Sequence, residues 1–269
     1  MHAKAAHPRL TEQPVREESA RLDLGTICHS LLLEGDVAKI HIIQATRWEG
    51  RGKERHDTHE PVTDYKTDAA REERDTARAN GQCPLLPHEI PTVTAMIQAC
   101  RRQLDAHEYG RELFTDAGIS EQTIVWREDN GVWCRGRLDW LHKTRPLIAD
   151  YKTGARSARP SSVSRVAASL GWPMQASFYR RGYRAVFGQD LEPDFLFVAQ
   201  ENYSPFALSV LELGPADLAL ADAQVDNAVR IFGECLKSRQ WPGYSRRVER
   251  ITSPPWIEAA FMEEQLEER

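Results

Sequence analysis

A run of strand-like segments in the middle of the chain is the feature that most constrains the fold. Apolar and polar side chains alternate along residues 119–128 and again along residues 132–142. The intervening Asp-Asn-Gly at 129–131 is typical of a tight hairpin turn, because Asn and Gly tolerate the backbone conformation that such turns require. A short apolar segment, 147–152, follows after a proline. These segments predict three neighbouring strands of one sheet.

Segments with helical periodicity lie on both sides of these strands. Their apolar residues recur every three or four positions, as on the buried face of a helix. The expected helices span residues 21–34, 88–114, 162–187 and 215–238, and further strands are expected at 194–200 and 206–213. The third of these helices is expected to break or begin near Gly171. This order predicts an α/β fold in which helices flank a mixed or mostly antiparallel sheet.

Composition sets limits on the class of protein. The chain has 269 residues, of which 41% are hydrophobic, and this suffices for the core of one domain. No run of about 18 apolar residues is present, so we expect no membrane-spanning helix. The N-terminal residues lack the apolar segment of a secretory signal, and the five cysteines form no CxxC pair. We therefore expect a cytoplasmic protein without a disulfide framework, a zinc ribbon or an iron–sulfur cluster.

The expected domain organisation is simple. A polar lead-in segment covers residues 1–20, and one domain covers residues 21–245. Within that domain, residues 47–82 carry many charges and few large apolar side chains, so we expect a charged insertion that is a long loop or a mobile segment. The charged residues 246–269 are expected to form a C-terminal tail.

Charge is distributed unevenly along the chain. The net charge is −5, which by itself argues weakly against nucleic-acid binding. Residues 135–184, however, contain eleven lysines and arginines and only two acidic residues, Asp139 and Asp150. A basic block in an acidic chain attracts a polyanion, although a solvated basic face is the simpler explanation. The position of the two acids decides between these interpretations.

The alternation of the predicted strands places charged residues together. In the second strand, Arg135, Arg137 and Asp139 share a face with Trp133, because side chains alternate between the two faces of a sheet. The residues expected on the opposite, apolar face are Val132, Cys134, Gly136, Leu138 and Trp140. In the third strand, Asp150 and Lys152 point the same way, away from Leu147, Ala149 and Tyr151.

Neighbouring strands bring Asp139 and Asp150 close together, and two such carboxylates repel unless a cation lies between them. Oxygen ligands favour Mg²⁺ or Mn²⁺. A metal beside Lys152 is the arrangement expected for metal-assisted phosphodiester hydrolysis. Charges on an edge strand remain the structural alternative, because the D…DxK spacing alone is only moderately specific.

The four letters of the third strand occur a second time, and context separates the copies. Residues 64–67 and residues 150–153 both read Asp-Tyr-Lys-Thr. The first copy lies in a charged stretch, whereas the second follows Pro-Leu-Ile-Ala. We assign the chemistry to the second copy, since a metal ligand needs a rigid support.

Other candidate residues are individually weaker. Gln175 and Tyr179 are four positions apart in an expected helix, so they share a face. His29 lies in the first expected helix, and Glu121 lies at the start of the first expected strand. Each of these residues also has an ordinary structural explanation when it is taken alone.

In combination, these residues resemble one family. Residues 24–34 read Leu-Gly-Thr-Ile-Cys-His-Ser-Leu-Leu-Leu-Glu, which is similar to a helix of the RecE-type (exonuclease VIII) nucleases. The later motifs that match are Glu121, Gly136-Arg137-Leu138-Asp139, Asp150-Tyr151-Lys152-Thr153 and Gln175-Ala176-Ser177-Phe178-Tyr179. The resemblance covers most of the chain and places it in the PD-(D/E)xK nuclease superfamily.

The resemblance implies a restriction-nuclease-like PD-(D/E)xK core and a processive 5′→3′ exonuclease that acts on double-stranded DNA ends. It also implies a phage or prophage recombination role, ring-shaped homo-oligomers and a single-strand annealing protein as partner. The site residues that it implies are Asp139, Asp150, the Tyr151 carbonyl and His29 on Mg²⁺, Glu121 at the site, Lys152 as the catalytic lysine, and Gln175 and Tyr179 orienting the site and the DNA strand.

Two departures and two alternatives belong beside this interpretation. Leu138 precedes the first acid where the superfamily motif has Pro, and residues 47–82 match no segment of the family. An endonuclease or single-strand nuclease of the same superfamily would carry the same site. A non-catalytic protein that binds DNA ends with the same fold is the alternative from another class. In the exonuclease interpretation and in both alternatives, Arg135 and Arg137 contact the DNA, so we expect DNA binding that weakens as the salt concentration rises.

Overall fold

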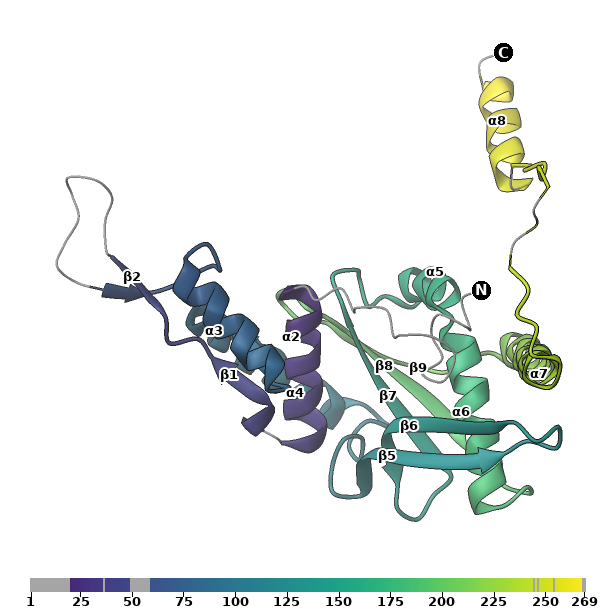
Figure 1. Cartoon of the computed structure of the whole chain (residues 1–269), viewed down its shortest axis with the longest axis horizontal. Helices are drawn as coiled ribbons and strands as arrows, with labels where there is room; N and C mark the ends of the chain where they lie inside the picture. Colours follow the sequence, from purple (N-terminus) through teal and green to yellow (C-terminus); the bar gives the residue numbers. More distant parts are fainter. Residues whose placement is uncertain are drawn as a thin grey trace. The chain divides into compact units, whose positions relative to one another are not determined.

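The computed structural model of the chain describes residues 20–35, 37–48, 59–243, 245, 247–253 and 255–267 (Figure 1). The lead-in segment expected at 1–20 lies outside the described residues, apart from its last residue. The chain divides into two compact units, of which Arg16–Gly233 holds all the elements discussed below except α8 and the end of α7. No helix in the described part combines the length and the apolar composition needed to cross a membrane.

The larger unit contains short runs of helices and short runs of strands in turn. Its helical elements are α2 (Ala20–His29), η1 (Ser30–Glu34), η2 (Val37–Lys39), α3 (Asp68–Ala79), η4 (Pro87–Glu89), α4 (Ile90–Ala106), α5 (Pro160–Leu170), α6 (Trp172–Phe187) and α7 (Pro215–Ser238). Its strands are β1 (Ile40–Ile42), β2 (Thr46–Trp48), β3 (His59–Pro61), β4 (Cys83–Leu85), β5 (Gly118–Arg127), β6 (Trp133–His142), β7 (Leu147–Gly154), β8 (Asp194–Glu201) and β9 (Leu208–Leu211).

The main sheet has the order β5-β6-β7-β8-β9, and the predicted mixed sheet is confirmed. All neighbours are antiparallel except β7 and β8, which run parallel. A parallel pair needs a crossover connection, and α5 and α6 supply it. The predicted hairpin turn joins β5 to β6, where the Gly131 N–H donates to the Glu128 carbonyl at 2.8 Å.

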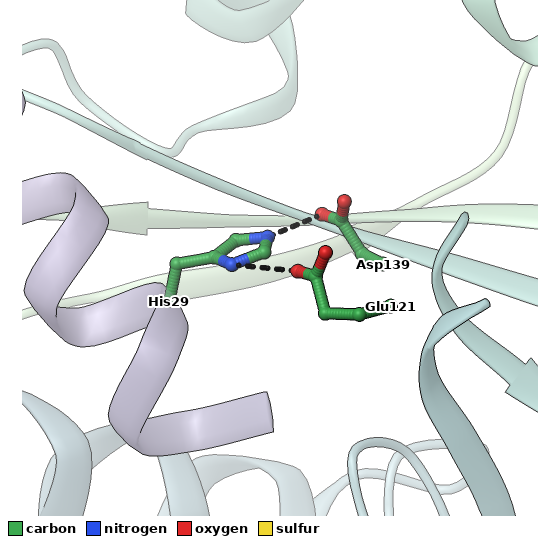
Figure 2. A group of neighbouring side chains, drawn as sticks. All are labelled: His29, Glu121 and Asp139. Carbon is green, nitrogen blue, oxygen red and sulfur yellow. Dashed lines mark ion pairs between the residues drawn. The ribbon is translucent and has the colours of Figure 1, made fainter. Parts of the chain in front are cut away.

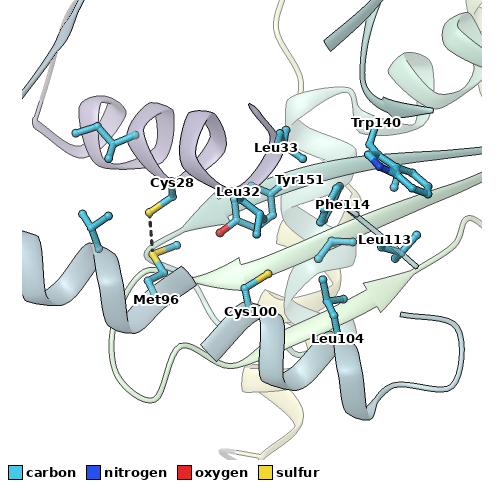
Figure 3. Packing of buried hydrophobic residues seen from close by; sticks show 14 of the residues in the cluster. Cys28, Leu32, Leu33, Met96, Cys100, Leu104, Leu113, Phe114, Trp140 and Tyr151 are labelled. Atoms are coloured by element: carbon cyan, nitrogen blue, oxygen red, sulfur yellow. Dashed lines mark hydrogen bonds between the residues drawn. The ribbon is translucent and has the colours of Figure 1, made fainter. Parts of the chain in front are cut away.

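Helices cover both faces of this sheet (Figure 1). On one face, α2 and α4 pack over Trp140, Ala149, Tyr151 and Val198. Figure 3 shows this cluster, with Cys28 of α2 facing Met96 of α4 and their sulfur atoms 3.5 Å apart. On the other face, α6 packs over a second cluster, whose buried members on the strands include Ile124, Trp126, Cys134, Leu138, Ile148 and Phe197. The central strands β7 and β8 are therefore buried on both sides for most of their length.

The expected alternation holds for β7 but changes phase in β6. Leu147, Ala149 and Tyr151 pack under α2 and α4, as predicted. In β6, Cys134 and Leu138 pack under α6, whereas Trp140 belongs to the opposite cluster. The prediction that one apolar face runs from Val132 to Trp140 is therefore wrong at its last residue. The switch occurs at Asp139, next to the place where β6 leaves β7.

The charged segment 47–82 is not a long loop throughout. Residues 68–79 form α3, so the expectation of a long loop or a mobile segment is wrong for that part. Thr67 caps the helix, because its Oγ1 accepts a hydrogen bond from the Ala70 N–H at 3.2 Å. Only Ala70 and Ala77 of α3 are buried, which explains why apolar periodicity did not reveal it.

The remaining boundaries follow the sequence with smaller differences. The helix expected at 88–114 ends at Ala106, and the one expected at 162–187 is divided at Gly171 into α5 and α6, as predicted. In the smaller unit, residues Pro255–Glu267 of the expected tail form the helix α8. The helix expected at 215–238 is α7 with the same limits.

Candidate active site

The candidate site lies where β6 and β7 part. These strands pair only at Trp140↔Ala149 and Leu141↔Ile148. Beyond the pair of Trp140 and Ala149 the two strands separate. There the Tyr151 N–H donates its hydrogen bond to the Asp139 side chain, at 2.9 Å from Oδ2, instead of to a backbone carbonyl of β6. A carboxylate is thereby fixed in the opening between two strands of a rigid sheet, which is the support a metal ligand requires.

His29 reaches this carboxylate from the end of α2 (Figure 2). Its Nε2 lies 3.1 Å from Asp139 Oδ2, and its Nδ1 lies 3.1 Å from Glu121 Oε1. Burial acts to lower the pKa of His29, but the hydrogen bond and charge of Asp139, together with Glu121 and Asp150, outweigh it and raise the pKa. A protonated His29 therefore holds the two carboxylates together as a cation.

The approach of α2 to the sheet depends on a small residue. A Cβ on Gly25 would lie 2.9 Å from Thr153 Oγ1, so any larger residue would push α2 away from β7. Directly after His29, the helix widens into the π-helical turn η1. Such turns are frequent at functional sites, because they re-aim neighbouring side chains. The Leu-Gly-Thr…His run thus sets both the distance and the direction of the histidine.

Asp150 is the most buried charged group of the site, with 1% of its side chain exposed. Its Oδ1 accepts hydrogen bonds from Lys152 Nζ at 2.6 Å and from Gln175 Nε2 at 2.8 Å. Burial, followed by the charge of Asp139, raises the pKa of Asp150 to about 7, although Lys152 and His29 act in the opposite direction. The predicted pair of Asp150 and Lys152 on one face is therefore present, and the carboxyl is held in an electrostatically costly position.

Glu121 has an unusual backbone for a strand residue. Its φ is +56°, in the left-handed region, where a non-glycine residue costs about 1–3 kcal/mol. The flanking pairs Ser120↔Trp140 and Gln122↔Leu138 place it opposite Asp139. This conformation lets the side chains of β5 switch sheet faces at the same level as those of β6. It also turns the Glu121 carboxylate toward His29. Burial raises the pKa of Glu121 despite the nearby charges of His29 and Arg137.

Gln175 and Tyr179 lie on the same face of α6, as predicted, and both reach the site. Gln175 holds Asp150, whereas the Tyr179 ring packs next to Gly136 of β6. A Cβ on Gly136 would come within 3.1 Å of the Tyr179 ring, so the glycine makes room for it. Burial and the charge of Asp150 raise the pKa of Tyr179, which keeps its hydroxyl protonated.

The structure thus brings together His29, Glu121, Asp139, Asp150, Lys152, Gln175 and Tyr179 from five elements. The two arginines differ in position. Arg137 forms an ion pair with Glu121, whereas Arg135 lies further along β6, opposite Val125. The Tyr151 hydroxyl donates to Gln200 Oε1 at 2.5 Å, so this side chain points into the core. The role of the Tyr151 carbonyl stays a prediction.

The donor set fits a divalent metal ion. Ligand atoms of His29, Glu121 and Asp139 all lie within 4.8 Å of one another. Asp150 Oδ2 is buried, accepts no hydrogen bond from the described residues and lies 2.6 Å from Lys152 Nζ, with which it forms an ion pair. A carboxylate oxygen has two lone pairs, so this oxygen can also serve as a metal ligand.

The first Asp-Tyr-Lys-Thr copy, residues 64–67, has a structural role. The Asp64 Oδ1 accepts a hydrogen bond from the Lys66 N–H at 3.0 Å, and Thr67 caps α3. This copy belongs to a turn and the start of a helix, whereas residues 150–153 lie in β7. The assignment of the candidate chemistry to the strand copy is consistent with this difference.

Trp172 also contacts the site, and sequence reasoning missed it. Lys152 Nζ lies 5.8 Å from the centre of its ring, and the ring stacks on Phe197. A cavity of about 550 Å³ opens beside Lys152 and is lined by Trp172, Arg156 and apolar residues of α5. The sequence signal around Trp172 was interpreted only as a helix break, because Gly171 and a proline flank it.

Comparisons with known proteins give the family and the fold of the chain. Residues 1–254 match a family described as "PDDEXK-like domain of unknown function (DUF3799)". A crystal structure of a protein from Eubacterium rectale, described as a "putative exonuclease", is similar with a TM-score of 0.54 and 12% identity, covering 94% of this chain and 84% of that one. At this identity the similarity shows the fold, and together with the family match it confirms the predicted restriction-nuclease-like α/β core. A search of curated proteins finds no match.

Proposed function

The chain belongs to the family of PDDEXK-like domains, and on this premise we propose that it is a metal-dependent DNA nuclease. We further propose that it acts as an exonuclease on the ends of double-stranded DNA. The observation that carries the proposal is the opening between β6 and β7, where Asp139, Asp150 and Lys152 meet His29. Acidic groups around a partly buried lysine on a rigid sheet suit phosphodiester hydrolysis better than a structural role.

Asp139, Asp150, His29 and the Tyr151 carbonyl are the groups that would hold Mg²⁺, with Mn²⁺ as its substitute. When bound there, the metal lowers the pKa of a water molecule and offsets charge on a phosphate. Binding requires His29 in its neutral form, so it competes with the proton that this residue carries between Asp139 and Glu121.

Lys152 is proposed to be the catalytic lysine. Its ammonium group lies 2.6 Å from Asp150 and next to the cavity of about 550 Å³. From there it can orient a water molecule or stabilise negative charge that develops on a phosphate. Gln175 keeps Asp150 in place through its amide. Tyr179 offers a protonated hydroxyl beside β6.

Finer features of the proposal rest on the resemblance to the RecE-type nucleases. They are 5′→3′ polarity, a role in phage or prophage recombination, a ring-shaped homo-oligomer and a single-strand annealing partner in the cytoplasm. Arg135 and Arg137 are proposed to contact the phosphates of the DNA, since they extend along β6 from Asp139. Such contacts position the substrate without base specificity.

One digestion separates the proposal from its alternatives. The same plasmid, in linear and in covalently closed circular form, is incubated with the protein in Mg²⁺ and in EDTA, and acid-soluble nucleotides are followed. Release from linear DNA only, and only with Mg²⁺, is expected. Cutting of the circle would favour the endonuclease alternative. Tight DNA binding without release from either form would favour the non-catalytic end-binding protein.

The matched control for this digestion is Lys152→Ala. It removes the ammonium group but none of the groups proposed to hold the metal. Loss of nucleotide release with retained DNA binding assigns the activity to this site rather than to a contaminating nuclease. Full activity in Lys152→Ala would contradict the role proposed for the lysine.

A further inference from the structure

The β5–β6 hairpin presents a surface of which the proposed function uses only Arg135 and Arg137. Its inner face packs under α6, and its outer face is exposed. We call the following residues the outer hairpin face: Thr123, Val125 and Arg127 of β5, with Trp133, Arg135 and Arg137 of β6. Trp133 is 66% exposed and Val125 is 53% exposed, so this face places two large apolar side chains among its arginines.

The register organises this face into three rungs. Thr123 pairs with Arg137, Val125 with Arg135, and Arg127 with Trp133. Each rung therefore carries one arginine, and none of the six positions carries an acid. Basic side chains thus follow the face from the end of the hairpin to the edge of the candidate active site, where Arg137 is paired with Glu121, and this arrangement complements a polyanion.

At the outermost rung, a cation and an aromatic ring are combined. The guanidinium carbon of Arg127 lies 5.8 Å from the centre of the Trp133 ring. Side-chain alternation in β6 directs Trp133 outward, and this cation–π contact restrains its ring on the surface. An exposed indole beside arginines is the combination that proteins use to stack an unpaired base while binding its phosphate.

The distance to the site suits a strand that passes over several rungs. Trp133 is six positions from Asp139 in β6, which corresponds to about 20 Å along an extended strand. A stacked nucleic-acid strand covers this distance with about six nucleotides, and an extended one with fewer. A single strand bound along the face therefore reaches both Trp133 and the opening between β6 and β7.

We propose that the outer hairpin face binds single-stranded DNA, with Trp133 as a stacking surface for a base and with Arg127 and Arg135 on the phosphates. A duplex offers no unpaired base to the indole ring, so a duplex alone gives no reason for an exposed tryptophan at this rung. The inference rests on the proposed function in that it extends the DNA path from the same site.

The test is fluorescence anisotropy of a labelled oligothymidylate of about 15 nucleotides, in EDTA so that no cleavage occurs. A blunt-ended duplex of two annealed DNA strands with the same label is the duplex probe. Trp133→Ala is expected to weaken binding of the single strand about tenfold. Its effect on the duplex probe is expected to be less than about threefold. Trp133→Phe is expected to retain most of the affinity, because a ring still stacks.

Tyr109→Ala is the matched control, since Tyr109 is an aromatic residue with 70% exposure that lies in the turn after α4. The affinity of the Tyr109→Ala variant for the single strand is expected to equal that of the unmodified protein. Arg127→Ala provides a second variant of the face, and it is expected to weaken the single strand more than the duplex probe.

Three results would overturn the inference. They are unchanged binding in Trp133→Ala, equal weakening for both probes, or a change of oligomeric state in Trp133→Ala, which would make the face an interface between copies. The nuclease proposal fails separately, when the unmodified protein releases no nucleotides in Mg²⁺. The anisotropy measurement in EDTA is independent of that result.

Discussion

Replacing Asp150 with Asn is expected to stabilise the metal-free protein while it removes a proposed metal ligand. The ionised carboxylate is buried beside Asp139, and Lys152 does not offset these two effects, so the pKa of Asp150 is raised from 3.8 to about 7. Asn has nearly the same shape as the protonated carboxyl and cannot ionise. The substitution therefore removes a charge that the folded protein holds at a cost.

The size of the effect follows from the shift. About three pKa units at 1.36 kcal/mol each give an upper value of about 4 kcal/mol. We expect an increase of about 2–4 kcal/mol in the free energy of unfolding, with the lower value if water enters the site and weakens the repulsion. For a domain of this size, that corresponds to a rise in Tm of about 5–15 °C.

The dependence on pH has a definite sign. Because the folded-state pKa of Asp150 lies above its unfolded value, the contribution of this residue to stability is complete below pH 3.8 and is lost as the pH rises through about 7. The advantage of Asp150→Asn over the unmodified protein is therefore near zero at pH 4, grows between pH 4 and 7, and is constant above.

The assay is thermal or urea unfolding at several pH values in EDTA, because a bound metal stabilises the unmodified protein and hides the difference. Glu73→Gln is the matched control of opposite sign. The pKa of Glu73 is lowered, since backbone hydrogen bonds from Gln44 and Ala45 and the side chain of His41 outweigh its burial. An Asp150→Asn variant that is no more stable than the unmodified protein at pH 8, or a difference that does not change with pH, would refute the reasoning.

Further substitutions test other parts of the account. Asp139→Ala and Lys152→Ala are each expected to reduce nucleotide release at least about 100-fold with an unchanged circular dichroism spectrum; near-normal release would remove that residue from the site. Arg135→Ala with Arg137→Ala is expected to lower the slope of log affinity against log salt by about 2, measured by titration of labelled duplex; an unchanged slope would place the phosphates elsewhere. Trp140→Ala, which empties a fully buried position, is expected to cost about 3–5 kcal/mol in urea unfolding, and a loss below about 1 kcal/mol would contradict the described core.

The parts of the fold that the sequence predicts are those with strong local signals. The hairpin follows from alternation around the turn at 129–131, and the faces of β7 follow from a two-residue period. The proximity of Asp139 to the end of β7 also follows, since the two strands are neighbours. The helix with Gln175 and Tyr179 was found because its four-residue spacing coincides with an apolar stripe.

Other features have no local signal. The left-handed backbone of Glu121 falls on a residue type that rarely adopts it, so the phase change of β5 and β6 is visible only in three dimensions. The helix α3 buries little more than alanines, and strands such as β1 and β4 have three residues each, so neither shows periodicity. The contact of Trp172 with Lys152 depends on the crossover between β7 and β8, which sequence spacing does not specify.

The central claim is that the opening between β6 and β7 hydrolyses phosphodiesters with a divalent metal. The most direct measurement is the rate of nucleotide release from an end-labelled linear duplex as Mg²⁺ is increased from zero, for the unmodified protein and for Asp139→Asn. The account predicts a rate that rises from zero and saturates in the unmodified protein, and no release at any Mg²⁺ concentration in the variant. Release that persists in EDTA, or equal Mg²⁺ curves for both proteins, would contradict it.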